Sequence, residues 1–293
     1  MRRKLIFHCF LWTYNNVREN LVKIKEAGFD AIQITPCQGV KNEGKEFWSY
    51  YQPLDMAIID TPLGTKQELI NLCQDANKIG IDIIADIVLR HVAGADDGSL
   101  TPHPKVANRL LKYIQKNIPE CNDYNDRYKY THHCTGMPIL NWDDIEYQTI
   151  CIQFLEDLKQ CGIKGFRLDQ LKHYPTEDEG STFLKNVFER FSDMILYGEI
   201  IDCNKYINDM YVRYMKVCGN GMTSDKSKYV IFFDSHDMYY TWKNTVNMPM
   251  QMQIDEWKIL LQNNCESDAL YFPHPYEITW KSKEIQDINK KYK

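Results

Sequence analysis

Acidic and basic side chains follow several apolar stretches of this sequence. The clearest case is GFRLDQLKHY, residues 165–174, which places Arg167 and Asp169 two positions apart in an otherwise apolar run. Residues two apart on a β-strand point to the same face, about 7 Å from each other. A guanidinium beside a carboxylate lowers the pKa of the carboxylate, so we expect Asp169 to be ionised. An ionised, oriented aspartate is suited to nucleophilic attack on a sugar carbon.

Two later carboxylates suit the complementary roles. Glu199 follows MILYG, and its apolar neighbours together with nearby carboxylates favour the protonated form, which can give a proton to a leaving oxygen. Asp237 ends FFDSHD and is suited to holding sugar hydroxyls and stabilising positive charge at a reacting carbon. Each charged pair is open to a second interpretation as a structural ion pair. For a charged pair on a single strand, the structural interpretation is the better one. Charged residues follow four of the predicted strands, however, and an active site explains that pattern better if these strand ends lie together.

Further polar candidates fall at the same strand ends or in the loop after the second strand. They are Tyr51, Asp86, Arg90, His91, Lys172, His173 and His236. A lone histidine is more often a hydrogen-bonded structural residue than a ligand, and Tyr51 fits either the core or a platform for a sugar. No HExxH motif or close His/Cys spacing indicates a metal site.

The elements that position these residues are strand-like runs alternating with amphipathic helical stretches. Two of the helical stretches end at Gly28 and Gly80, and the apolar runs lie at 5–12, 29–36, 81–88, 163–170, 194–201, 228–237 and 268–275. The runs are apolar on both faces, as is typical of parallel strands covered by helices. We therefore predict an α/β fold, a (β/α)8 TIM barrel, whose strand ends share one rim.

One long segment interrupts this alternation. Residues 92–143 are rich in Pro, Asn, Asp, His and Tyr, and a structureless loop of that size is unusual. We predict a small subdomain inserted after the third strand, with residues 1–91 and 144–293 forming the catalytic barrel. Residues 203–227 offer little room for a complete sixth βα unit, so the course of the chain there is left open.

The composition of the chain indicates which classes of partner and which cellular location to expect. The chain has 293 residues and a net charge of −5, which gives no general attraction to nucleic acid. No run approaches the length of a membrane span, and the basic and apolar start of the chain is predicted to be a strand rather than a secretory signal. The ten cysteines show no framework spacing, which favours reduced thiols and a cytoplasmic location. The oligomeric state is left open.

Four motifs in order resemble those of the α-amylase family of retaining glycoside hydrolases. They are DIVLRH (86–91), GFRLDQLKH (165–173), YGEI (197–200) and FFDSHD (232–237). The resemblance implies that Asp169 is the nucleophile, Glu199 the general acid/base and Asp237 the transition-state stabiliser. It also implies that Arg167 orients the nucleophile and that Asp86 braces the floor of the site. The substrate-binding residues that it implies are Tyr51, His91, Lys172, His173 and His236.

The activity implied by this resemblance is hydrolysis of α-1,4-glucosidic bonds in an α-glucan. A transglycosylase, an enzyme acting on sucrose or short α-glucosides, and a non-catalytic glucan-binding protein remain alternatives. Arg90 departs from the family pattern, because it stands where an Asn usually binds calcium, and an arginine has only donors. We therefore expect no cofactor, with Arg90 taking the place of the ion and pairing with Asp143 or Asp144. We also expect no C-terminal β-sandwich of the kind found in the family after the barrel.

Overall fold

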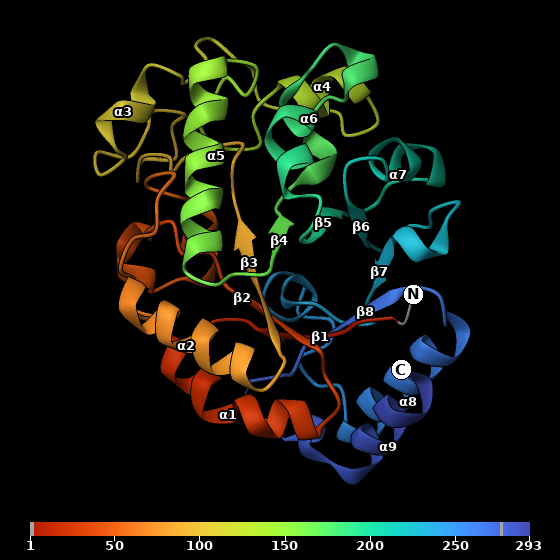
Figure 1. The fold of residues 1–293 in the computed structure, drawn as a ribbon. Coiled ribbons are helices and arrows are strands. Elements are labelled where there is room, and N and C mark those ends of the chain that lie inside the picture. The colour runs from red at the N-terminus through yellow and green to blue at the C-terminus, as the bar shows by residue number, and fades with distance from the viewer. Residues whose placement is uncertain (1–2, 276–277) are drawn as a thin grey trace.

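The computed structural model describes residues 3–275 and 278–293, which form a closed barrel of eight parallel strands (Figure 1). The strands follow one another around the barrel in chain order, and the last pairs with the first. The predicted fold class is therefore confirmed. The strands are β1 Leu5–Cys9, β2 Ala31–Ile34, β3 Asp82–Ile87, β4 Gly165–Leu168, β5 Ile195–Ile200, β6 Lys216–Gly219, β7 Tyr229–Ile231 and β8 Asp268–Tyr271.

Helices cover the outside of the barrel, and local signals explain where they begin. Helix α2 starts at Thr65, whose hydroxyl accepts from the backbone N–H of Glu68 while the Glu68 carboxylate accepts from that of Thr65. Gly80 follows this helix at a φ of +68°, which favours glycine. The helices are α1 Tyr14–Glu26, α2 Lys66–Lys78, α3 Asn108–Leu111, α4 Arg127–His132, α5 Ile145–Gln160, α6 Phe183–Phe188, α7 Lys205–Tyr211, α8 Met250–Asn263 and α9 Lys283–Tyr292.

Alternation along the strands separates two packed regions. Phe166 and Leu168 of β4 belong to the large core between strands and helices, as their positions in the sequence predict. Arg167, between them, faces the barrel interior with the carboxylates described below. A smaller apolar cluster also lies in that interior and comprises Ile6, Ala31, Ile84, Tyr197, Cys218, Val230 and Leu270.

The segment between β3 and α5 contains the short helices α3 and α4. Figure 1 shows both at the top of the view, on the side toward which β3 and β4 run. The bridge between His91 and Ile139 joins the start of this segment to its end. The segment thus lies beside the rim where the charged residues gather, although its boundaries at residues 92 and 143 remain predictions.

Several elements are shorter than the sequence predicts. Strand β1 stops at Cys9 rather than at residue 12, because Leu11 takes a left-handed backbone with a φ of 59°. Strand β7 ends at Ile231, so Asp237 lies beyond it, at the start of a π-helical turn, Asp237–Thr241. The sixth unit is abbreviated because only the 3₁₀ turn Lys226–Lys228 lies between β6 and β7.

None of the helices in the described part of the chain is long and apolar enough to cross a bilayer.

Candidate active site

A pocket of about 670 Å³ opens at the carboxyl end of the barrel. It brings together seven of the candidate residues from the loop after β2, from β5, and from the segments that follow β4 and β7. These seven are Tyr51, Asp169, Lys172, His173, Glu199, His236 and Asp237. The other four, Asp86, Arg90, His91 and Arg167, are buried behind or beside the pocket and are not among its lining residues.

Arg167 is the electrostatic centre of the site. Its Nη1 donates to Asp86 Oδ1 and to Asp169 Oδ1, each at 2.9 Å, and its Nη2 donates to Glu199 Oε1. Strand register explains the arrangement, because Arg167 pairs with Asp86 on β3 and with Tyr197 on β5, two residues before Glu199. One guanidinium therefore holds three carboxylates, from β3, from the residue after β4 and from β5.

Burial dominates the ionisation of two of these carboxyl groups. It raises the pKa of Asp169 well above its ordinary value, and the negative charge of Glu199 raises it further, while Arg167 acts in the opposite direction. Burial also raises the pKa of Asp86 to about 6. The sequence-based expectation of a lowered pKa for Asp169 is therefore wrong. The reason is that the positive charge of Arg167 does not offset the burial of Asp169 and the negative charges of its neighbouring carboxylates.

Asp237 and His236 also line the pocket. His236 Nε2 lies 3.5 Å from Asp237 Oδ2, and the Thr241 hydroxyl donates to Asp237 Oδ1 at 3.3 Å. Burial raises the pKa of Asp237 and lowers that of His236 to about 3. The imidazole is therefore neutral near neutral pH and can both donate and accept hydrogen bonds.

Tyr51 contacts both Asp86 and His236. It ends the 3₁₀ helix Phe47–Tyr51, and its hydroxyl donates to Asp86 Oδ2 at 2.8 Å. Its ring stacks on His236 with centroids 5.3 Å apart and an interplanar angle of 9°. His91 Nε2 donates to the Tyr51 carbonyl at 2.8 Å, and burial lowers the pKa of His91 to about 4. In this structure His91 therefore holds the backbone of Tyr51 through a hydrogen bond.

Lys172 and His173 lie on the Glu199 side of the pocket. The Lys172 ammonium donates to the Ile201 carbonyl at 2.7 Å, and His173 Nδ1 donates to the Tyr130 carbonyl at 2.6 Å. Both side chains thus connect the segment after β4 to neighbouring elements while they line the pocket.

Arg90 makes different contacts from those that the sequence predicted. It is fully buried, and its guanidinium donates to the carbonyl oxygens of His173 at 3.2 Å, Thr131 at 3.0 Å and His133 at 2.6 Å. The predicted pairing with Asp143 or Asp144 is wrong, because both carboxylates are used locally. The first accepts from the Ser181 hydroxyl, and the second caps the start of α5.

The contacts of Arg90 also indicate whether calcium could bind at this position. Backbone carbonyls are good ligands for Ca²⁺, but here the guanidinium itself occupies the space between those of His173, Thr131 and His133. The residues around Arg90 therefore do not fit a calcium ion. Within the part of the chain that the structure describes, there is also no cluster of three His, Cys, Asp or Glu side chains that could hold a metal.

Aromatic residues at the pocket rim were not assigned by the sequence. Trp48, Tyr124 and Trp242 line the pocket and are 37%, 55% and 50% exposed. Flat exposed rings beside a polar pocket suit the apolar faces of sugars. Trp48 could have been predicted from the sequence, because it lies in the same loop as the candidate Tyr51. Tyr124 and Trp242 lie in irregular segments whose position depends on the tertiary fold.

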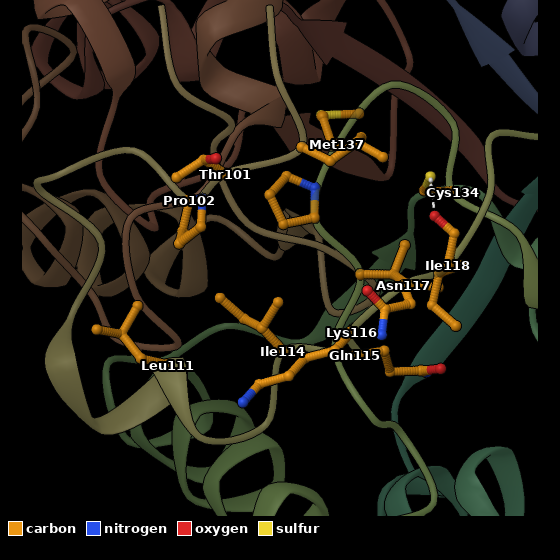
Figure 2. A pocket seen from close by; sticks show the side chains of 13 residues that line it. Thr101, Pro102, Leu111, Ile114, Gln115, Lys116, Asn117, Ile118, Cys134 and Met137 are labelled. Atoms are coloured by element: carbon orange, nitrogen blue, oxygen red, sulfur yellow. Dashed lines mark hydrogen bonds between the residues drawn. The ribbon is translucent and has the colours of Figure 1, made fainter.

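A second cavity, of about 570 Å³, lies within the inserted segment (Figure 2). Its apolar lining comes from Leu100, Pro102, Leu111, Ile114, Ile118, Met137, Pro138 and Ile139. No Asp, Glu or His is among its described lining residues, so it offers no carboxylate and no imidazole for acid/base chemistry. The pocket at the barrel rim is the candidate active site.

A closed (β/α)8 barrel with ionisable groups gathered at the carboxyl ends of its strands is the arrangement found in barrel enzymes. The family model described as "Alpha amylase, catalytic domain" matches residues 13–267. The chain therefore belongs to the alpha-amylase family.

Individual relatives agree with this assignment. An alpha-amylase of Clostridium acetobutylicum is 31% identical over 230 residues, 73% of this chain and 30% of the relative. An alpha-amylase of Aeromonas hydrophila is 28% identical over 246 residues, 72% of this chain and 51% of the relative. The chain thus spans about half or less of the length of these relatives.

Solved structures show the same fold. The alpha-amylase of Geobacillus thermoleovorans complexed with acarbose superposes with a TM-score of 0.75 and 21% identity, covering 99% of this chain and 77% of that one. The cyclomaltodextrin glucanotransferase CldA gives a TM-score of 0.78 and 15% identity, covering 99% of this chain and 80% of that one.

Proposed function

We propose that this chain is a retaining α-glucan hydrolase that cleaves α-1,4-glucosidic bonds through a covalent glycosyl-enzyme intermediate. The observation that carries the proposal is the placement of Asp169 and Glu199 on one guanidinium in a pocket that Asp237 also lines. Family membership supports the reaction class, and relatives named alpha-amylase support the choice of substrate.

In the first step the Asp169 carboxylate forms a bond to the anomeric carbon as the bond to the leaving oxygen breaks. Glu199 gives its proton to that oxygen and becomes a carboxylate. Its Oε1 accepts from Arg167, so we assign the transferable proton to Oε2, which accepts a longer bond of 3.3 Å from the backbone N–H of Gln170. The mechanism requires an ionised Asp169 and a proton on Glu199 when the glycosidic bond breaks.

In the second step Glu199 removes a proton from water, and the resulting oxygen attacks the anomeric carbon and releases Asp169. Asp237 stabilises positive charge at that carbon in both steps. Tyr51 stacks on the sugar, His236 forms hydrogen bonds with it, and Lys172 and His173 face the leaving group. Direct contact between His91 and the sugar stays a prediction.

The same proposal includes no bound cofactor. The Arg90 guanidinium supplies the positive charge that joins the inserted segment to the barrel, which makes the enzyme independent of calcium. We also propose a cytoplasmic location, supported by the ten free thiols, which suit a reducing compartment.

Product analysis tests the function. The protein is incubated with soluble starch, maltohexaose and sucrose, and the anomeric configuration of the first products is followed by NMR. We expect malto-oligosaccharides with retained α-configuration from starch and maltohexaose, and no reaction with sucrose. An inverted product contradicts the mechanism. Products longer than the substrate identify a transglycosylase, whereas binding without turnover identifies a non-catalytic glucan-binding protein.

A further inference from the structure

A buried lysine outside the candidate site joins two segments that border it. Lys41 begins the 3₁₀ turn Lys41–Gly44 and is only 5% exposed. Its ammonium donates to the carbonyls of Gly94 at 2.7 Å and Ala95 at 3.3 Å, and it lies 3.1 Å from the carboxylate of Asp96. These three partners lie at the start of the inserted segment. A buried ammonium needs such partners because transfer from water is costly.

The same ammonium lies near the substrate pocket. It is 5.9 Å from the centroid of the Trp48 ring, which is within the range of a cation–π interaction. Trp48 lines the pocket, whereas Lys41 itself does not. Lys41 thus lies between the inserted segment and an aromatic wall of the pocket, without contact to the reacting groups.

The backbone between these two residues is tightly wound. Asn42 and Glu43 have left-handed φ angles of 54° and 56°, and Gly44 follows at 71°. A Cβ atom at Gly44 would lie 2.5 Å from the Tyr50 hydroxyl oxygen, so the turn is packed closely against the helix that carries Trp48. Left-handed backbone at non-glycine residues costs free energy and persists only where surrounding contacts hold it. The Lys41 ammonium provides such contacts at one end of the turn.

We propose that Lys41 is a positioning residue, which sets the orientation of Trp48 by fastening its loop to the start of the inserted segment. Its loss weakens substrate binding and leaves bond cleavage largely unchanged. The binding part of this inference rests on the proposed glucan hydrolase function, whereas the orientation of Trp48 does not.

The test compares Lys41→Met with Lys45→Met, an exposed lysine of the same loop, and with Lys41→Arg. Lys41→Met keeps an apolar side chain of similar length and removes the donors. We expect its KM for maltohexaose to rise about three- to tenfold, the scale of one aromatic contact, with kcat within about twofold. Lys45→Met should match the wild type, and Lys41→Arg should restore most of the affinity.

A Trp48→Phe background separates the two parts of the inference. Iodide quenching of tryptophan fluorescence, measured with and without Trp48, reports the exposure of that ring in the free protein. We expect Lys41→Met to change the Trp48 component, and to raise KM in the wild-type background but not in Trp48→Phe. An unchanged Trp48 component overturns the inference even if the protein has no activity on glucans. An equal rise of KM in both backgrounds also overturns it, because Lys41 would then act by another route.

Discussion

Replacing Arg90 with methionine tests the electrostatic attachment of the inserted segment. The variant keeps an apolar side chain of related length and removes all donors to the carbonyls of His173, Thr131 and His133. A hydrogen bond from a charged donor contributes about 1.5–3 kcal/mol, so three of them set an upper range of roughly 4.5–9 kcal/mol.

The cost of burying the charge reduces this range. Burial lowers the pKa of Arg90 to about 10, so the guanidinium is still protonated near neutral pH, but its desolvation offsets part of the hydrogen-bond energy. We therefore expect Arg90→Met to lower the free energy of unfolding by about 3–4 kcal/mol. For a domain of this size, that corresponds to a fall in Tm of about 5–7 °C.

Three measurements decide this prediction. Differential scanning calorimetry gives Tm, limited proteolysis reports loosening of residues 92–143, and starch hydrolysis reports activity. Lys105→Met, an exposed lysine in the same segment, is the matched control and should behave as the wild type. The wild type should keep its Tm and activity after treatment with a chelator. If chelation lowers both and calcium alone restores them, the reasoning is wrong, as it is if Arg90→Met unfolds at the wild-type temperature.

The other predictions concern the carboxylates and Tyr51. Asp169→Asn should retain the fold and lose at least about 10⁴-fold in kcat on starch, whereas Glu199→Gln should lose about 10²–10⁴-fold and recover with a substrate whose leaving group needs no proton; equal loss on both substrates contradicts the acid role. Because the pKa of Asp169 is raised, kcat/KM should fall with decreasing pH well above pH 4, where an ordinary aspartate titrates; a profile that stays flat down to pH 4.5 contradicts this. Tyr51→Phe should lower the free energy of unfolding by about 1–3 kcal/mol, because it removes a donor to the buried Asp86, and an unchanged Tm in calorimetry would exclude that contribution.

The sequence predicts the barrel well because its signals are local. Apolar runs of strand length and glycines after helices are visible in any window of the chain, and they agree with the observed strands in order and direction. Spacing along β4 also predicts that Arg167 and Asp169 share a face, and the bond of 2.9 Å between them agrees with this. The ends of the strands are less predictable, as at Leu11, where a left-handed residue stops β1 within an apolar run.

Properties that depend on several strands at once cannot be read from one of them. From β4 alone, Asp169 has a single arginine neighbour and a lowered pKa. The structure adds burial and the charges of Asp86, Glu199 and Asp237, and the direction of the shift reverses. The partners of Arg90 were missed for a related reason. Backbone carbonyls are present at every residue, so the sequence gives no sign of which three will meet a guanidinium.

Lys41 and Arg90 together explain how the inserted segment is held over the pocket. The first binds carbonyls at residues 94 and 95, near the start of the segment, and the second binds carbonyls at residues 131 and 133, near its end. Both cations are buried, and both also reach a part of the pocket wall, Trp48 in one case and the backbone of His173 in the other. Their charges are covalently part of the chain, so we expect this attachment to be insensitive to the concentration of a dissolved ion. Arg90 keeps its charge near neutral pH, because burial lowers its pKa only to about 10.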